Sequence, residues 1–374
     1  MATPYRIHIT PTNTGLWNIR QSEEAAQTVS ETLQKDLEMP HHLLALYGTG
    51  ASVADIQKAY DLRRPLQRPV VPQHQDAVEN LITHWDRASK YLGKEEYYPD
   101  FLAYFQRAID REGYESVVKT HLLKGDGSAN DLFLQQPAIV AQALAQTCVH
   151  NIEGLDQLLL DGERLANPNP DPADMPSLLS MYEKVRTDPQ LTGSVRMEDK
   201  SKIEDGIVQR AKDAMLAIFE QVHVEPDKPD ERTAEMFHGM ILVASSAAIH
   251  PPPHHVKYDF FLMHHVNSSL IYSTLNSQPW LSTADKVRLL EWKIRLDLVQ
   301  YAARGCPPVS LEGIASYVPK QPSEESVREI GMRFYEFGDD GHAIKQARAT
   351  AICHELIAIG LEGYLWPRLA EAIF

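Results

Sequence analysis

Residues 257–304 read as two consecutive helices in which polar side chains fall among large apolar ones. In the first helix a histidine and an amide follow an aromatic residue at i+4 and i+7, in the order Phe260, His264 and Asn267. Residues at this spacing share one helix face, which is unusual for a face that only packs in a core. His264 is therefore interpreted either as a core histidine with a hydrogen-bond partner or as a ligand in a site, while the adjacent His265 lies on the neighbouring face.

The second helix of this stretch carries a lysine in an apolar setting. Ser282 is typical of an N-cap, and Lys293 lies one turn from leucines on either side. A lysine so placed must extend its amine to solvent, pair with an acid, lose its proton or be modified. The simplest interpretation is an ion pair with Asp297, one turn later.

Bulk composition describes a globular chain with an acidic surface. The 374 residues are 43% hydrophobic and carry a formal charge of -15, which argues against nucleic acid as a partner. The N-terminal stretch has no apolar signal-peptide core, and no run of 18 apolar residues suggests a membrane span, so we expect a cytoplasmic protein. Three widely spaced cysteines are typical of reduced, buried thiols.

The periodicity of the rest of the chain is helical. Residues 1–18 are expected to form an extended arm, residues 203–222 one amphipathic helix, and residues 232–249 a helix buried on all sides. Alternating strands, GxGxxG and GxxxxGK motifs are absent from the sequence. We therefore predict an all-α protein over residues 19–374, either one large helical bundle or a two-lobed version of it.

Several blocks, in order along most of the chain, resemble the questin oxidase-like family, oxidoreductases found largely in fungal aromatic polyketide pathways. The blocks are HHLLALYGTGASVADIQKAYD, LQQPAIVAQALAQTCVH, HPPPHHVKYDFFLMHHVNSS, QPWLSTADKVRLLEWKIRLDLVQYAARG and FGDDGHAIKQARA. The resemblance implies a questin oxidase-like helical domain over residues 19–374. It also implies an enzyme of secondary metabolism that opens a ring of an anthraquinone-like polyketide, by Baeyer-Villiger-type or dioxygenase-type cleavage with dioxygen.

The same resemblance implies cofactors and site residues. A mononuclear Fe(II) held by histidines and a carbamylated lysine would account for the reaction with dioxygen. On the matching positions these metal ligands are His41, His42, His264 and Lys293. Adjacent helical residues point about 100° apart, so one of His41 and His42 would face the metal. The family is described as NADPH-dependent, so NADPH would be an external reductant, because the chain lacks a Rossmann fingerprint.

Further residues are candidates for a substrate pocket or for replacement ligands. Aromatic side chains stack on flat substrates, and they also pack in cores. The candidates for the pocket are Phe260, Phe261, Trp292, His238 and His342. His342 follows an acidic turn at the start of a predicted helix, where capping by Asp339 is the simpler interpretation.

One departure from the family concerns residues 125–137. Family members usually carry a histidine-rich block before the QQPAI stretch, and here GDGSANDLF runs directly into LQQPAI, as if about twenty residues were missing. If that block supplies ligands, then His150, His238 or His342 would have to replace them, or the gene model is altered. The alternative function is a catalytically impaired homologue that binds aromatic polyketides without turnover.

Overall fold

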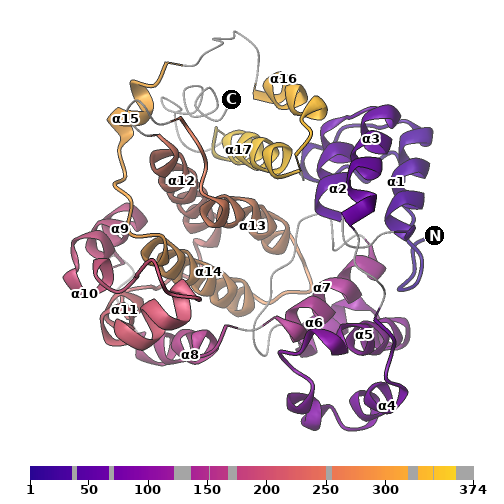
Figure 1. The fold of residues 1–374 in the computed structure, drawn as a ribbon, viewed down its shortest axis with the longest axis horizontal. Coiled ribbons are helices and arrows are strands. Elements are labelled where there is room, and N and C mark those ends of the chain that lie inside the picture. Colours follow the sequence, from indigo (N-terminus) through magenta and orange to yellow (C-terminus); the bar gives the residue numbers. More distant parts are fainter. Residues whose placement is uncertain are drawn as a thin grey trace. The chain divides into compact units, whose positions relative to one another are not determined.

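The computed structural model shows a protein built from helices (Figure 1). It describes residues 1–35, 40–66, 71–121, 136–150, 152–166, 175–249, 255–318, 327–339 and 341–358. Within these ranges no β-strand forms, and the one β-bridge joins Thr3 and Arg6. The prediction of an all-α protein is confirmed.

The chain divides into two compact units, each described here by itself. Unit 1 comprises Met1–Asn151 and Arg328–Arg348, and unit 2 comprises Ile152–Val327 and Ala349–Phe374. Each unit therefore takes residues from two separate stretches of the chain. The predicted boundary between residues 1–18 and 19–374 stays a prediction.

Unit 1 packs an N-terminal arm against helices. Its main helices are α1 (Glu23–Lys35), α2 (Pro40–Thr49), α3 (Val53–Arg63), α4 (Gln75–Thr83), α5 (Tyr98–Glu112), α6 (Tyr114–His121) and α7 (Pro137–Val149). In the arm, the Ile7 amide donates to Gln34 and the Ile9 amide to Ser30, both on α1. These bonds satisfy backbone groups that would otherwise be unpaired beside the core, so the arm is an integral part of unit 1.

The C-terminal stretch of unit 1 packs on the same core as the N-terminal helices. It contains most of α16 (Val327–Met332), a 3-10 turn (Arg333–Glu336) and the start of α17 (His342–Ala358). The Tyr335 hydroxyl donates to the Thr49 carbonyl at 2.5 Å, and Ile344 belongs to the cluster of buried side chains that includes Leu43 and Ile56. Helix α17 begins at His342, as the sequence predicts, and Asp339 accepts a hydrogen bond from the Ala343 amide.

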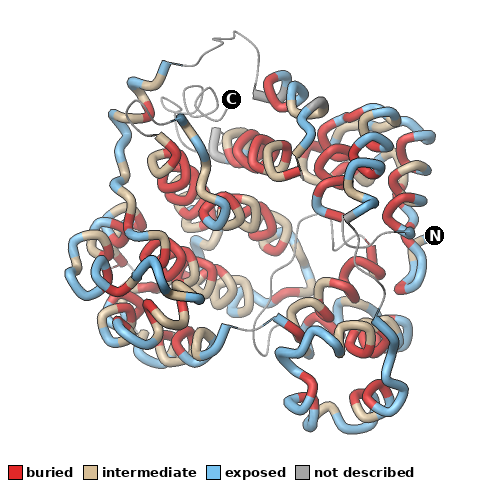
Figure 2. Tube along the Cα trace, in the orientation of Figure 1, coloured by how far each residue is buried: buried red, intermediate tan, exposed pale blue. Residues whose placement is uncertain are grey.

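Unit 2 is organised around three long helices. They are α12 (Pro229–Ala248), α13 (Phe260–Asn276) and α14 (Thr283–Ala303). The shorter helices of the unit are α8 (Leu155–Leu165), α9 (Leu178–Thr187), α10 (Pro189–Thr192), α11 (Lys212–Phe219) and α15 (Leu311–Ala315). Helix α12 is buried along most of its length and packs on α13, α14, α9 and α15, which confirms the predicted central helix (Figure 2).

The prediction of one continuous helix over residues 203–222 of unit 2 is wrong. In place of a continuous helix over 203–222, residues Lys202–Val208 form a π-helical segment and α11 starts only at Lys212. Between them Ala211 leaves helical geometry, with φ -137° and ψ 24°. The wider π turn shifts the register of the following side chains, a change that average 3.6-residue periodicity cannot reveal.

Candidate functional site

Helices α13 and α14 are fixed at their starts by side-chain caps. Asp259 accepts hydrogen bonds from the Phe261 and Leu262 amides at 3.0 and 3.1 Å. Ser282 accepts from the Asp285 amide at 3.1 Å, which confirms the predicted N-cap. These caps satisfy free amides of the first turn and so set where each helix begins.

A buried ion pair lies on α14 where that helix faces α13. The Lys293 amine donates to both carboxylate oxygens of Asp297, at 2.5 and 2.6 Å. The side chains of Lys293 and Asp297 are only 4% and 1% exposed. The i, i+4 pairing that the sequence predicts for Lys293 is therefore confirmed, and it is held out of solvent.

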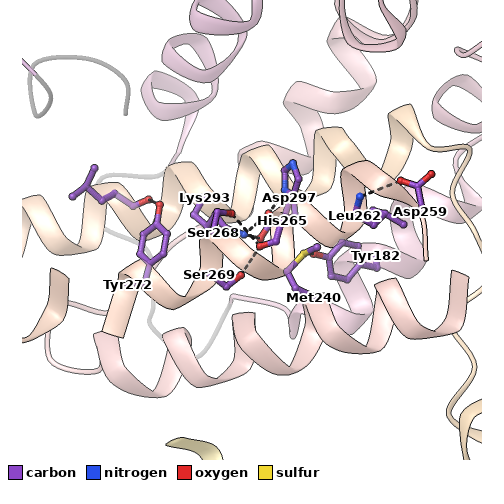
Figure 3. Close-up of polar contacts among 11 residues, drawn as sticks. Tyr182, Met240, Asp259, Leu262, His265, Ser268, Ser269, Tyr272, Lys293 and Asp297 are labelled. Carbon is purple, nitrogen blue, oxygen red and sulfur yellow. Dashed lines mark hydrogen bonds and ion pairs between the residues drawn. The ribbon is translucent and has the colours of Figure 1, made fainter. Parts of the chain in front are cut away.

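The second partner of Asp297 comes from α13. His265 bonds through Nδ1 to Oδ1 of Asp297, one of the two carboxylate oxygens that accept from Lys293, so the three side chains point toward one another (Figure 3). We call His265, Asp297 and Lys293 the Asp297 group. The imidazole is 13% exposed, which makes it the most accessible member of the group.

The Asp297 group lies among side chains that keep their protons. Burial, strengthened by the charge of Asp297, raises the pKa of the Tyr182 phenol well above its ordinary value. Burial likewise raises the pKa of the Cys353 thiol. By contrast, burial lowers the pKa of Lys293, against the opposing effect of Asp297. Burial thus favours the neutral forms of the Tyr182 phenol and the Cys353 thiol.

His264, the histidine that the sequence favours, takes a different direction. Its ring meets the ring of Phe260 edge-on, with 4.5 Å between centroids. Neighbouring helical positions diverge by about 100°, so one histidine of the pair faces Asp297 while the other follows the Phe260 face. The sequence indicated the helix and the lysine, and of the two histidines it favoured His264 over His265 as a site residue.

The predicted metal ligands are divided between the two units. His41 and His42 lie on α2 in unit 1, where His41 is exposed and His42 is 7% exposed. His264 and Lys293 lie in unit 2. Because each unit is described by itself, the grouping of the four residues stays a prediction.

Some of the side chains predicted as ligands have donor atoms that suit a metal. Imidazole nitrogen suits iron, so the histidines are suitable ligands. Lys293, as placed, is bound to Asp297 and would have to leave that carboxylate before it could become a carbamate. In the described part of the chain, no three His, Cys, Asp or Glu side chains form a group that could hold an ion.

The structure describes the surroundings of each predicted pocket residue separately. Trp292 donates its indole hydrogen to Glu163 of α8 at 3.0 Å, so its indole nitrogen lies against α8. Phe260 and Phe261 are about half exposed, at 52% and 47%. His238 lies on α12, where burial lowers its pKa, and His342 belongs to unit 1. A pocket common to these residues stays a prediction.

The junction that the sequence marks as shortened lies largely outside the described residues. Residues 122–135 are not described, and the structure resumes at Gln136. The Gln136 side chain exchanges two hydrogen bonds with the backbone of His8, at 3.0 and 3.1 Å.

None of the helices described is long and apolar enough to cross a membrane.

The sequence of this chain is similar to a family profile and to several fungal oxidases. A profile described as questin oxidase-like matches residues 38–135 and 133–350. A questin oxidase of Aspergillus terreus is 29% identical over 419 residues, covering 100% of this chain and 93% of that protein. A questin oxidase of Aspergillus fumigatus is 30% identical, and a Baeyer-Villiger oxidase of Pestalotiopsis fici is 29% identical. Both of these alignments cover 89% of this chain and 81% of the relative.

The matches also bear on the junction. The two matched segments meet at residues 133–135, inside the interval where the sequence predicts missing residues. The alignment with the Aspergillus terreus protein is longer than this chain of 374 residues, so that relative has residues without a counterpart here. That a histidine block is among them stays a prediction.

Proposed function

This chain belongs to the questin oxidase-like family, and from that premise we propose that it is an oxidoreductase that opens a ring of an aromatic polyketide with dioxygen. The relatives are named as questin oxidases and Baeyer-Villiger oxidases, all of fungal origin. We further propose an anthraquinone-like substrate and a net Baeyer-Villiger-type or dioxygenase-type cleavage.

The observation that supports the proposal most is that the match includes the Asp297 group. The second matched segment spans α12, α13 and α14, which carry and enclose it. A buried acid, base and ammonium among apolar helices can shift protons on a phenolic substrate while water is kept out. Ionisation of the substrate would favour oxidative ring opening, because dioxygen reacts with electron-rich, ionised aromatics; activation by a metal is the other route.

Iron is the proposed cofactor, with His41 or His42, His264 and Lys293 as its ligands, and NADPH is the proposed external reductant. When bound, iron would supply the activation of dioxygen. The suitable donor type of the histidines supports this assignment, whereas the engagement of Lys293 with Asp297 requires an exchange of partners first.

The test is oxygen uptake by the purified chain with an anthraquinone, with and without NADPH, followed by mass analysis of the product. We expect oxygen consumption that depends on substrate and a product that contains added oxygen. Metal analysis of protein expressed with iron should give close to one equivalent in the wild type and a clear loss in His264→Ala. His255→Ala, an exposed histidine of unit 2, is the matched control. Absence of uptake with every anthraquinone tried would refute the enzymatic proposal.

A second candidate function is a binding protein without turnover. It is favoured by two findings: the two matched segments meet at residues 133–135, and the Aspergillus terreus relative has additional residues, which we propose lie at this junction. This candidate predicts quenching of protein fluorescence on addition of an anthraquinone, without oxygen uptake. Measurable turnover would exclude it.

A further inference from the structure

The amide of Asn267 differs from the other polar groups of α13 in its hydrogen bonding. Its oxygen and its nitrogen are both shielded from solvent, and within the described residues neither atom has a hydrogen-bond partner. By contrast, the Tyr272 hydroxyl donates to a carbonyl of α14 at 3.1 Å. The Asn276 amide donates to Asp230 and to Thr233, at 3.0 Å each. The fold thus satisfies the amide of Asn276 and leaves that of Asn267 unsatisfied.

An amide without partners destabilises the protein that carries it. A buried donor or acceptor gives up its hydrogen bonds to water, and here the fold supplies none to either atom of Asn267 in return. An apolar side chain of similar size, such as leucine, would avoid this cost. Folded proteins satisfy nearly all of their buried polar groups, so the exception at Asn267 points to a group from outside the chain.

The residues on the same helix face as Asn267 suit an aromatic ligand. Phe260, His264 and Asn267 follow one another at i, i+4 and i+7, so they share one face of α13. The Phe260 ring is 52% exposed and meets the His264 ring edge-on, with 4.5 Å between centroids. This face therefore leads from aromatic rings at its solvent end to a shielded amide, and aromatic rings stack on flat ligands.

The chemistry of an amide defines what it can recognise on such a ligand. Nδ2 of Asn267 donates hydrogen bonds and Oδ1 accepts them. A ring carbonyl with a hydroxyl on the neighbouring ring position presents the complementary acceptor and donor. A hydroxylated anthraquinone carries this pair of groups, whereas an aromatic hydrocarbon carries neither.

We propose that Asn267 recognises the substrate: Nδ2 donates to a ring carbonyl of a hydroxylated aromatic ketone, and Oδ1 accepts from the neighbouring hydroxyl. The inference rests on the proposed function, from which it takes the class of substrate. No covalent bond forms or breaks at Asn267, so the residue determines affinity and specificity. The substrate supplies the partners that the fold does not.

The first experiment separates a recognition residue from a structural one, by urea unfolding. Asn267→Leu removes two unpaired polar atoms, so its unfolding midpoint should equal or exceed that of the wild type. Asn276→Leu is the matched control on the same helix; it loses the bonds to Asp230 and Thr233 and should unfold at a lower urea concentration. Asn267→Ala has no branched side chain and repeats the test without a possible clash.

The second experiment measures binding without oxygen, by quenching of protein fluorescence. Danthron, a hydroxyanthraquinone whose hydroxyls flank one carbonyl, is compared with anthraquinone, which has the carbonyls alone. The wild type should bind danthron more tightly than anthraquinone. Asn267→Leu should bind danthron about 10-fold to 100-fold more weakly, as two lost hydrogen bonds predict, and should lose the preference for it. Asn276→Leu should keep the affinity and the preference of the wild type.

The outcomes distinguish this inference from the proposed function. Weaker binding of danthron by Asn267→Leu, without oxygen uptake by the wild type, would refute the enzymatic function and leave the recognition role intact. Oxygen uptake by the wild type, with an affinity for danthron that Asn267→Leu leaves unchanged, would overturn the recognition role and leave the function intact. The role would also be overturned if Asn267→Leu and Asn267→Ala both lost as much stability as Asn276→Leu, or if the wild type did not prefer danthron to anthraquinone.

Discussion

Removal of the Lys293 amine should show how much the Asp297 group contributes to the stability of unit 2. Lys293→Met keeps the apolar stem and leaves a carboxylate that is 1% exposed without its ion-pair partner. Loss of one member of a buried pair costs about 3–5 kcal/mol. Because His265 still donates to Asp297, we expect the lower end, about 3 kcal/mol.

Hydrogen exchange read by mass spectrometry measures this locally, on peptides from α13 and α14. A loss of about 3 kcal/mol corresponds to roughly 100-fold faster exchange, since about 1.4 kcal/mol is a factor of ten. The double variant Lys293→Met, Asp297→Asn removes the uncompensated charge and keeps an acceptor for His265, so exchange should return to within about tenfold of the wild type. Lys200→Met changes an exposed lysine of the same unit and should have an effect within about 0.5 kcal/mol.

This reasoning would be refuted if Lys293→Met accelerated exchange less than about threefold, or if the double variant were no more stable than the single one. Either result would mean that the buried carboxylate does not depend on the lysine for its charge balance.

Three further predictions concern unit 1. The hydrogen bond to the Asp100 carboxylate raises the pKa of His74 above 6.5. The ion pair therefore contributes its full stability below that pH, and this contribution is lost as the pH rises through the raised pKa. The difference between wild type and His74→Gln in the urea concentration at the unfolding midpoint should shrink between about pH 5 and pH 9. Gly341→Ala would put a methyl group 2.3 Å from the His42 ring at φ +84°, and should cost about 1–3 kcal/mol in urea unfolding. Ser52→Ala breaks the capping box of α3 and should cost about 1 kcal/mol in the same assay.

Two of these predictions have a matched control variant, and the third has an outcome that would contradict it. Gly338→Ala should be tolerated, because nothing lies within 4 Å of its added carbon. Ser52→Thr keeps the capping hydroxyl and should restore most of the lost stability. If the difference in the urea midpoint between wild type and His74→Gln did not change with pH, the stabilisation by His74 would not be electrostatic.

Much of the fold can be predicted from the sequence, because helical periodicity and caps are local properties. Ser282 caps the start of α14 and His342 begins α17, as the residues on either side indicate. The π-helical segment at Lys202–Val208 could not be predicted in this way, since it changes the register without changing the composition. The pairing of the N-terminal arm with α1 also depends on contacts between residues distant in sequence.

In the candidate site too, contacts within one helix could be predicted from the sequence, whereas contacts between two helices could not. Lys293 and Asp297 are one helical turn apart, so their pairing follows from spacing alone. Which of His264 and His265 faces Asp297 depends on the rotation of α13 against α14, and both helices are buried on more than one side. The signal available in the sequence was the acid at position 297, which needs a second hydrogen-bond partner once it is buried.

The division of unit 1 between two stretches of chain sets an order of events during synthesis. Ribosomes deliver the N-terminal helices first, yet Tyr335, which bonds to Thr49, and Ile344, which completes the core, emerge only after all of Ile152–Val327. The first unit to emerge from the ribosome is thus completed only after most of unit 2 has been synthesised, and its incomplete core must wait without aggregating while α8 to α15 are made. Fragments that end before residue 328 should for this reason depend on chaperones more than the full chain does.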